Sequence, residues 1–481
     1  MAKSRFEELD SLQKTLNHAI DTLRYELIAA NLPPLSLQAT EPHPLDDCSF
    51  PVPPRLYEAR RLALASMGQL KSLLSFPYEK VSEEAYAVYD RACLDVLVHT
   101  GLVDYLAEAA SRQNGVHVDE LQKALDMDGR KLTIVLRYLS TNGWVRETEE
   151  SVFALNRPGF ELLPGKNGRK RVLTPNVPDI ANSLVKWLQH PEWKYSDSSV
   201  KTAFQLVHNT DLAVFDWVKD QPDVFVPFAE GIRAVGDAYV RGVLSDYPWK
   251  SLAGTTIIDI GGGQGTLSIQ LAKEFPELRF IVQDLPEALV LAKPNIESQL
   301  PGALEAGRFV LEAQDFFKPQ CRKGDAYTYM FRHVLHDWAF DDGVKILKMV
   351  AEAAGSSSKI LIIETVSVPG IVSNAAIEDP LTALSGDKYE PVTPPAFIPA
   401  NLGWASKYKE GQVLHLLNLF NAQGRTLAAW TKLTEDAGLK ISKVHTLRAN
   451  VSVIECLTGR YTNGVNGASH TNGSSHTNGA A

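Results

Sequence analysis

The chain contains few cysteines and no long apolar run, and both absences narrow its class. Its four cysteines among 481 residues show neither the paired spacing of a disulfide framework nor that of a zinc site. They therefore indicate reduced thiols in a cytosolic protein. No apolar run approaches the length of a membrane span, and the N-terminus lacks the apolar core of a signal peptide. We expect a cytoplasmic protein with no membrane partner and no bound metal.

An excess of basic residues is also missing. The formal net charge is −9, which argues against nucleic acid as the main partner. Hydrophobic residues make up 44% of the chain and charged residues 22%, as in an ordinary folded globular protein. A chain of 481 residues is long enough for two or three domains with large cores.

The most informative stretch is residues 255–286, TTIIDIGGGQGTLSIQLAKEFPELRFIVQDLP. Its first six residues are apolar and largely β-branched, which predicts a buried parallel strand that carries Asp259 near its end. Glycines follow at Gly261, Gly262, Gly263 and Gly265. They let the backbone turn sharply and approach a ligand where any side chain would intrude. A helix with an apolar face then precedes Pro276.

A second predicted strand, residues 279–282, brings an acid to the same edge of the sheet. This acid, Asp284, is placed to hold the two ribose hydroxyls of a nucleotide. A dinucleotide fingerprint would have a further glycine at position 266, where this chain has Thr266. The spacing therefore favours a mononucleoside ligand, and a Rossmann site for NAD or FAD is the alternative.

The sequence from Asp259 to Gly265, acid-x-Gly-x-Gly-x-Gly, resembles motif I of the class I S-adenosylmethionine (SAM) methyltransferases. More narrowly, GGGQG followed by FIVQDLP resembles the small-molecule O-methyltransferases of plant and fungal secondary metabolism. The resemblance covers roughly residues 80–460. It implies a doubly wound α/β sheet, SAM as cofactor and a small-molecule metabolite as substrate. It also makes Asp315 and Phe316 similar to the family's adenine-contacting acid and its aromatic neighbour.

Catalytic chemistry is expected in residues 326–338, AYTYMFRHVLHDW. A strand there delivers His336 and Asp337 to the carboxyl edge of the sheet, where doubly wound folds bind ligands. Methylating a hydroxyl requires removal of its proton, and histidine can accept a proton near neutral pH. By resemblance His336 is the general base, and Glu364, after a later strand, orients it. His333 is expected to face elsewhere in a structural role.

A helix preceding the glycine-rich stretch resembles the part of the family that lines the acceptor pocket. In it, Phe225, Phe228 and Ile232 are placed over the substrate by the resemblance. An aromatic stripe at helical spacing is also typical of plain core, so this second interpretation stays open.

Two positions depart from the family's pattern on the acceptor side. The family usually has Asn-x-x-Glu-Arg-Thr near the last helix, whereas residues 421–426 read NAQGRT, with Gly424 in place of the glutamate. Eleven residues upstream, where the family often has an aspartate, this chain has Val413. The two changes predict a widened apolar wall that suits a bulky hydrophobic substrate.

The departures leave two activities open. One is O-methylation of a phenolic or enolic metabolite of polyketide type. The other is that of the fungal pericyclases that resemble these enzymes, keep the SAM site and catalyse dehydration, Diels–Alder or Alder-ene reactions. In such an enzyme SAM is not consumed, and His336 polarises a substrate carbonyl. Fixed positive charge in a dry pocket stabilises a developing oxyanion well.

The rest of the chain predicts a modular organisation. The expected parts are a helical arm (1–80), a winged-helix dimerisation domain (81–165), a helical connector lining the substrate pocket (166–250), the SAM-binding domain (251–461) and a disordered Ser/Asn/Gly-rich tail (462–481). A winged helix can bind DNA, but the expected recognition helix lacks a dense basic face. The resemblance instead implies a homodimer formed through the N-terminal parts.

Overall fold

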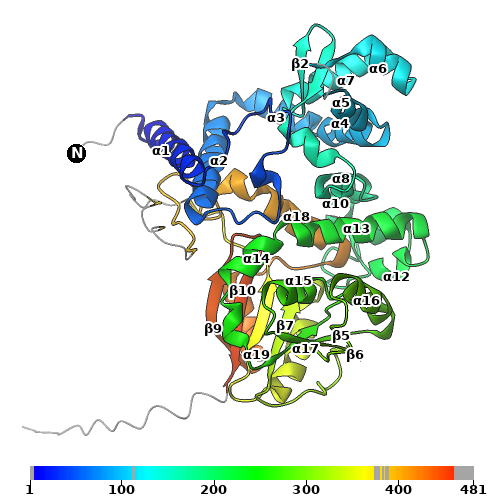
Figure 1. Cartoon of the computed structure of the whole chain (residues 1–481), viewed down its shortest axis with the longest axis vertical. Coiled ribbons are helices and arrows are strands. Elements are labelled where there is room, and N and C mark those ends of the chain that lie inside the picture. The colour runs from blue at the N-terminus through cyan, green and yellow to red at the C-terminus, as the bar shows by residue number, and fades with distance from the viewer. Residues whose placement is uncertain (1–4, 111–113, 373–379, 382–383, 385–388, 460–481) are drawn as a thin grey trace, which may run out of the picture.

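The computed structural model describes residues 5–110, 114–372, 380, 381, 384 and 389–459 (Figure 1). The predicted disordered tail, 462–481, lies outside them. An α/β part fills the lower half of the view, and the N-terminal helices lie above it. Helices α13 (Pro222–Ala238) and α18 (Lys407–Phe420) run between the two halves. Within the described residues, no helix is long and apolar enough to span a membrane.

The lower part is built on a seven-stranded sheet of order β6-β5-β4-β7-β8-β10-β9. Its strands are β4 (Thr256–Ile260), β5 (Arg279–Asp284), β6 (Phe309–Ala313), β7 (Tyr327–Arg332), β8 (Ile360–Glu364), β9 (Leu439–Thr446) and β10 (Ser452–Thr458). Strands β4 to β8 pair in parallel, and only β10 runs in the opposite direction. The chain leaves β4 first toward β5 and later returns to its other side at β7. The doubly wound sheet expected from the sequence is therefore confirmed.

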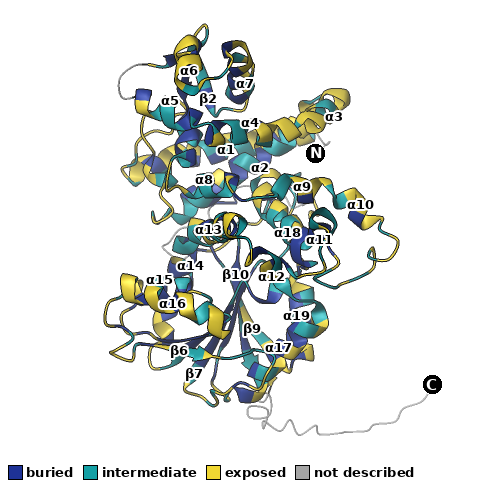
Figure 2. Ribbon diagram, turned by 90° about the vertical axis from the view of Figure 1, so that its right-hand side faces the viewer, coloured by how far each residue is buried: buried dark blue, intermediate teal, exposed yellow. Residues whose placement is uncertain are grey.

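Alternate residues of the strands feed two separate cores. Ile257 and Leu361 pack into a cluster on one face of the sheet, and their neighbours Ile258 and Ile360 pack into a cluster on the other. This follows from the two-residue period of a β-strand. Figure 2 shows the buried strands enclosed by helices with exposed outer faces. The covering helices are α14 (Val240–Asp246), α15 (Thr266–Glu274), α16 (Pro286–Gln299), α17 (Phe340–Ala353) and α19 (Leu427–Asp436).

The upper part is mostly helical. It contains α1 (Glu7–Ala29), α2 (Pro54–Leu74), α3 (Pro77–Tyr86), α4 (Val88–His99), α5 (Leu102–Ala110), α6 (Val118–Leu125) and α7 (Gly129–Thr141), with strands β1 (Val116–His117), β2 (Val145–Glu149) and β3 (Val152–Leu155) in the order β1-β3-β2. Helix α3 begins at Pro77, because proline is preorganised for the first turn of a helix. The winged-helix assignment of residues 81–165 stays a prediction.

The arm formed by α1 and α2 packs on the chain's own later residues. Leu12 and Leu62 share a hydrophobic cluster with Leu384 and Ile398. The guanidinium of Arg55 donates to the carbonyl of Leu381 and binds the carboxylate of Glu26. The arm is therefore anchored to the segment that follows β8.

The connector between the two parts is a series of short helices. They are α8 (Asn167–Val172), α9 (Val177–Asn182), α10 (Leu184–Leu188), α11 (Ala203–His208) and α12 (Val214–Val218), followed by the longer α13. The hydrophobic cluster of this region also includes the C-terminal end of α18, through Leu419 and Phe420. The expected helical connector is thus tied to the last third of the chain.

Candidate active site

The glycine-rich loop after β4 has a backbone that only glycine adopts easily. The φ angles are +66° at Gly261, +54° at Gly263 and +70° at Gly265. A Cβ atom on Gly261 would lie 2.8 Å from a methyl carbon of Val334, whereas one on Gly263 would meet nothing within 4 Å. The loop is therefore packed underneath and open above Gly263, as a cradle for a ligand requires.

Two acids hold this loop in different ways. The Asp284 carboxylate, half-buried at the end of β5, accepts from the backbone N–H groups of Gly263 and Leu285, each at 2.7 Å. The Asp259 carboxylate is buried and accepts from the hydroxyl of Ser268 at 2.6 Å. Burial raises the pKa of Asp284, and it raises the pKa of Asp259 to about 6. Asp259 therefore supports the loop from below, and Asp284 is the acid with access to a ligand.

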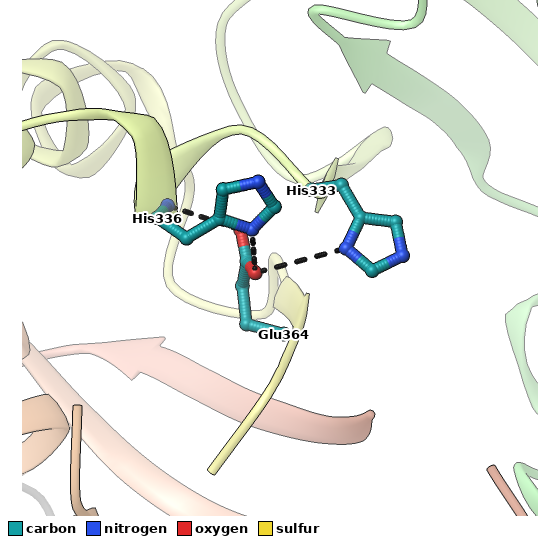
Figure 3. Close-up of side chains that lie close together, drawn as sticks. All are labelled: His333, His336 and Glu364. Atoms are coloured by element: carbon teal, nitrogen blue, oxygen red, sulfur yellow. Dashed lines mark hydrogen bonds and ion pairs between the residues drawn. The ribbon is translucent and has the colours of Figure 1, made fainter. Parts of the chain in front are cut away.

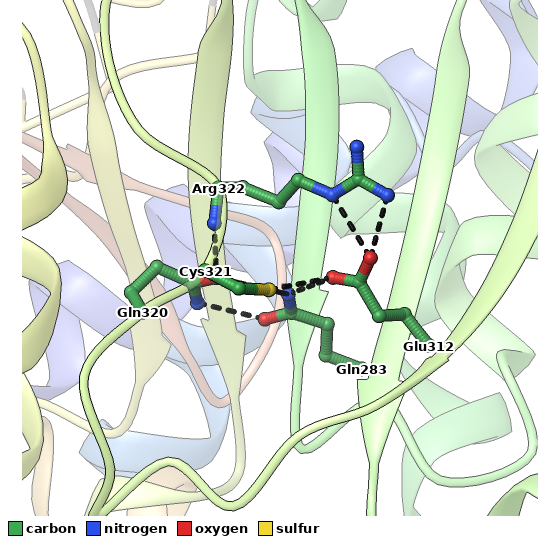
Figure 4. A network of polar contacts seen from close by, with 5 residues as sticks. All are labelled: Gln283, Glu312, Gln320, Cys321 and Arg322. Atoms are coloured by element: carbon green, nitrogen blue, oxygen red, sulfur yellow. Dashed lines mark hydrogen bonds and ion pairs between the residues drawn. The ribbon is translucent and has the colours of Figure 1, made fainter.

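A polar network fixes the strand that carries Asp284 (Figure 4). The amide of Gln283 donates to Glu312 on β6 at 2.6 Å and to Gln320 at 2.9 Å. Glu312 in turn accepts from both the Nε and an Nη of Arg322, at 2.9 and 2.5 Å. The carboxyl ends of β5 and β6 are thereby held in fixed register beside the glycine loop.

Aromatic side chains form one wall next to this loop. Asp315 accepts from the backbone N–H of Phe317 at 2.9 Å, which orders the turn after β6. Phe316 lies 3.7 Å from the position of a Cβ on Gly261 and meets the ring of Trp338 edge-on, with centroids 5.7 Å apart. The residues predicted to contact the adenine, Asp315 and Phe316, therefore lie beside the predicted cofactor loop.

His336 and Glu364 form the central pair of the site (Figure 3). Nδ1 of His336 lies 2.7 Å from Oε2 of Glu364, which is completely buried at the end of β8. The other carboxylate oxygen accepts from the backbone N–H groups of Val334 at 3.0 Å and His336 at 3.3 Å. On the far side of the ring, Nε2 lies 3.2 Å from Oδ1 of Asp337. The carboxylate thus fixes both the ring and the loop that carries it.

The surroundings of His336 favour its charged form. Burial alone lowers its pKa, but the adjacent carboxylates of Glu364 and Asp337 outweigh burial and raise the pKa well above the ordinary value. Burial likewise raises the pKa of Glu364, and the neighbouring imidazolium more than reverses this. The carboxylates of Glu364 and Asp337 therefore favour the imidazolium form of the His336 ring.

His333 does not face away as expected. Its Nδ1 lies 3.9 Å from Oε2 of Glu364, and its ring centroid lies 5.4 Å from that of His336. A left-handed backbone, with φ of +55°, turns the side chain toward the acid. Burial and the nearby Arg332 lower the pKa of His333 to about 3, so its ring is neutral. The donor atoms of His333, His336 and Glu364 lie within 4.8 Å of one another, close enough to hold a metal ion.

Comparison with known proteins supports the same family. The O-methyltransferase domain family matches residues 193–378. An O-methyltransferase of Armillaria gallica is 30% identical, over 80% of this chain and 85% of its own length. The 3-O-methyltransferase 2 of Phanerochaete chrysosporium is 31% identical, over 82% of this chain and 85% of its own. This chain belongs to the O-methyltransferase family.

Solved structures show the same fold. LepI in complex with SAM superposes with a TM-score of 0.63 at 20% identity, covering 83% of this chain and 94% of LepI. The mitomycin 7-O-methyltransferase MmcR superposes with a TM-score of 0.59 at 20% identity, covering 79% and 97%. As in its family, the cofactor of this protein is SAM. The open cradle above Gly263 and the accessible carboxylate of Asp284 fit its nucleoside.

Two arginines of this family member were given no role from the sequence. The buried guanidinium of Arg425 donates to the carbonyls of Leu335 at 2.7 Å and Trp338 at 2.6 Å, so it holds the turn that contains His336. Arg332 donates to the carbonyl of Gly236 at 3.1 Å, and its buried Nε has no hydrogen-bond partner among the described residues. The Arg-Thr of the family's Asn-x-x-Glu-Arg-Thr pattern was the available signal for Arg425.

The acceptor-side residues occupy three different environments. Phe228 is buried in the hydrophobic cluster that includes Leu419, which agrees with the alternative interpretation as core. Phe225 is partly buried, and Ile232, one turn beyond Phe228, is exposed and able to contact a ligand.

Val413 and Gly424, the two residues that differ from the family's pattern, face each other. A Cβ on Gly424 would lie 2.6 Å from a methyl carbon of Val413 and 3.0 Å from the hydroxyl of Ser367. The valine therefore fills the space beside the glycine, and the wall is not widened there as the sequence suggested. A glutamate at 424 cannot be accommodated unless Val413 is also changed.

Proposed function

We propose that this protein transfers the methyl group of SAM to the oxygen of a phenolic or enolic metabolite. The observation that carries the proposal is that one residue, Val334, links the catalytic pair to the cofactor loop. The side chain of Val334 lies under Gly261, while the backbone N–H of the same residue binds Glu364. Val334 therefore connects the glycine loop to the His336–Glu364 pair.

The residues divide the chemistry between binding and proton transfer. SAM supplies a methyl group on a positively charged sulfur, which an oxygen nucleophile attacks once it has lost its proton. His336 accepts that proton at Nε2, the nitrogen that Glu364 does not bind. Glu364 holds the ring in place and stabilises the imidazolium that results. Asp337, beside Nε2, positions the acceptor hydroxyl.

The raised pKa of His336 predicts the direction of the pH dependence. Only the neutral ring can accept a proton, and a raised pKa keeps that form scarce at neutral pH. The rate of methyl transfer should therefore increase as the pH rises through the His336 pKa.

The cofactor contacts are proposed as in the sequence analysis. Asp259 and the loop glycines Gly261, Gly263 and Gly265 form the SAM-binding motif, Asp284 holds the ribose hydroxyls, and Asp315 with Phe316 contacts the adenine. In addition, the buried Arg332 lies near Asp259 on β4, and its Nε has no hydrogen-bond partner among the described residues. Its guanidinium is proposed to bind the carboxylate of SAM.

A phenolic acceptor and a homodimer complete the proposal. The related fold of NcsB1 was solved with 1,4-dihydroxy-2-naphthoic acid, a phenol of the expected kind. Large apolar side chains are exposed from the end of α2 through α3, at Leu74, Phe76, Tyr78, Val81 and Tyr86. Contiguous exposed apolar surface of this type is typical of a subunit interface.

A second activity is favoured by one observation. In the described residues two carboxylates, those of Glu364 and Asp337, stabilise the charged form of His336. Gly424 supplies no third carboxylate. An imidazolium polarises a substrate carbonyl, as a SAM-binding pericyclase requires, and does not need to lose its proton. The rate of such a cyclisation should fall as the pH rises through the same pKa.

The two activities are separated by following both reactants. The purified protein is incubated with methyl-labelled SAM and a metabolite extract of the source organism. Label in the product, with S-adenosylhomocysteine formed in equal amount, is expected for methyl transfer. Product formed with SAM unchanged would contradict methyl transfer and support the cyclisation.

A further inference from the structure

A large cavity lies beside the active site, on the far side of β8. Its volume is about 800 Å³, within the range of small-molecule sites. Four segments distant in sequence enclose it: α2, the residues after β8, the start of α18 with η5 (Gly403–Ser406), and the turn between β9 and β10. None of the residues assigned above to the cofactor or to proton transfer lines it.

The charge of the cavity is opposite to that of the whole protein. Arg60, Arg61 and Lys409 line it, and none of the described lining residues is an acid, although the chain has a net charge of −9. Arg61 is paired with the buried Glu58 at 2.7 Å. In the described part of the chain, Arg60 and Lys409 have no carboxylate within 4 Å. Two positive charges are therefore left for a ligand.

Polar groups in the wall also lack partners. Nζ of Lys409 donates to the carbonyl of Val366 at 2.7 Å, which uses one of its three N–H donors. The buried amide nitrogen of Asn450 lies beside the hydroxyl of Tyr239 but, among the described residues, makes no hydrogen bond of normal geometry. Buried donors are normally satisfied, so this pair of groups calls for an acceptor such as a carboxylate.

The remaining wall is mostly aliphatic and includes four aromatic side chains. The rings of Tyr239 and Tyr408 lie 5.8 Å apart with an interplanar angle of 34°. Tyr57 comes from α2, and Trp404, 47% exposed, comes from η5. An apolar wall with several flat rings, together with the cations, suits an aromatic ligand that carries an anionic group.

The cavity and the catalytic pair share structural elements. Val366 and Ser367 line the cavity and follow Glu364 by two and three residues, a distance of roughly 7–10 Å along an extended chain. Thr426, also in the wall, follows the Arg425 that holds the His336 turn. Between them, Gly424 lies against Ser367 and Val413, so this boundary carries no charge that would repel an anion.

We infer that this cavity binds an aromatic carboxylate, with the carboxylate on Lys409, Arg60 and Asn450, and that this ligand is the acidic end of the methyl acceptor. The identification of this ligand as the methyl acceptor rests on the proposed function. The binding of an aromatic carboxylate does not, because it needs neither SAM nor turnover.

The test compares two probes that differ only in charge. 2-Naphthoic acid, ionised at pH 7, and its uncharged amide are titrated into the full-length protein by calorimetry. Hydrogen bonds from charged groups are worth about 1.5–3 kcal/mol, so the acid should bind roughly ten-fold or more tightly than the amide. Equal affinity for the acid and the amide would overturn the inference, as would equal competition by inorganic phosphate.

Matched variants locate the site. Lys409→Met should reduce the affinity for naphthoate roughly ten-fold and leave that for the amide unchanged. Lys407→Met, an exposed position on the same helix that does not line the cavity, should have no effect. If the two variants bind naphthoate equally, the carboxylate is held elsewhere and the inference is wrong. Unfolding curves for both variants show whether each remains folded.

Turnover distinguishes this inference from the proposed function. Naphthoate binding that depends on Lys409, in a protein that never forms S-adenosylhomocysteine, would support the cavity and contradict methyl transfer. Methyl transfer that proceeds equally with acidic and uncharged phenols would support the proposed function and contradict the role of the cavity in acceptor choice.

Discussion

Replacing Glu364 by glutamine tests the centre of the proposed site with the smallest change of shape. In the native protein one carboxylate oxygen accepts from two backbone N–H groups, and the other binds Nδ1 of His336 at 2.7 Å. An amide has only one acceptor oxygen. If that oxygen stays with the backbone donors of Val334 and His336, the amide NH₂ group faces Nδ1 and donates to it. The proton of the neutral ring is then forced onto Nε2.

The size of the effect follows from this tautomer. A ring protonated at Nε2 cannot accept the proton of the acceptor hydroxyl. The loss of general-base catalysis is worth about 10²–10⁴-fold in rate. The pKa of His336 should also fall, because Glu364 is the nearer of the two carboxylates that raise it. Above its new, lower pKa the Glu364→Gln enzyme should therefore be slow at every pH.

The assay measures S-adenosylhomocysteine formation against pH for the native protein and for Glu364→Gln. The native rate should increase with pH through a raised pKa, and the variant should reach a much lower plateau at lower pH. Glu455→Gln serves as the control, since this carboxylate on β10 binds Lys359 and Tyr247 away from the site. Native rates and a native pH profile in Glu364→Gln would refute the assigned roles of both residues. Greater activity at low pH than at high pH would instead favour the cyclisation.

Three further changes test other parts of the site. Asp284→Ala should weaken SAM binding by about 1.5–3 kcal/mol, the value of hydrogen bonds to a charged group, whereas the exposed Glu287→Ala should not; equal affinities by calorimetry would contradict the assigned ribose contact. Val413→Ala combined with Gly424→Glu should methylate an uncharged phenol at the rate of Val413→Ala alone, and a large loss would point to a reaction that needs His336 as a cation. Phe76→Glu should convert a dimer to a monomer in light scattering, because this exposed apolar side chain lies in the proposed interface, and an unchanged mass would exclude that interface.

Features carried by consecutive residues could be predicted from the sequence. The apolar run before Asp259, the glycines after it and the acid that ends the next strand are local patterns. Their physical basis is also local: β-branched residues suit a buried strand, and glycine adopts φ angles near +60° at little cost. The doubly wound sheet was expected from the family resemblance that these local motifs carry. His336 was placed at the carboxyl edge because it directly follows a predicted strand of that sheet.

Features that depend on distant residues were decided by the tertiary structure. No local pattern indicated that His333 turns toward Glu364, because its left-handed backbone is set by the packing of the loop. Nor could the sequence show that Val413 fills the space beside Gly424, since they belong to different elements. The raised pKa of His336 arises from burial together with a carboxylate 28 residues away in sequence. The cationic cavity likewise exists only where α2, α18 and the β9–β10 turn converge, because burial and charge proximity are properties of the folded arrangement and not of any single stretch.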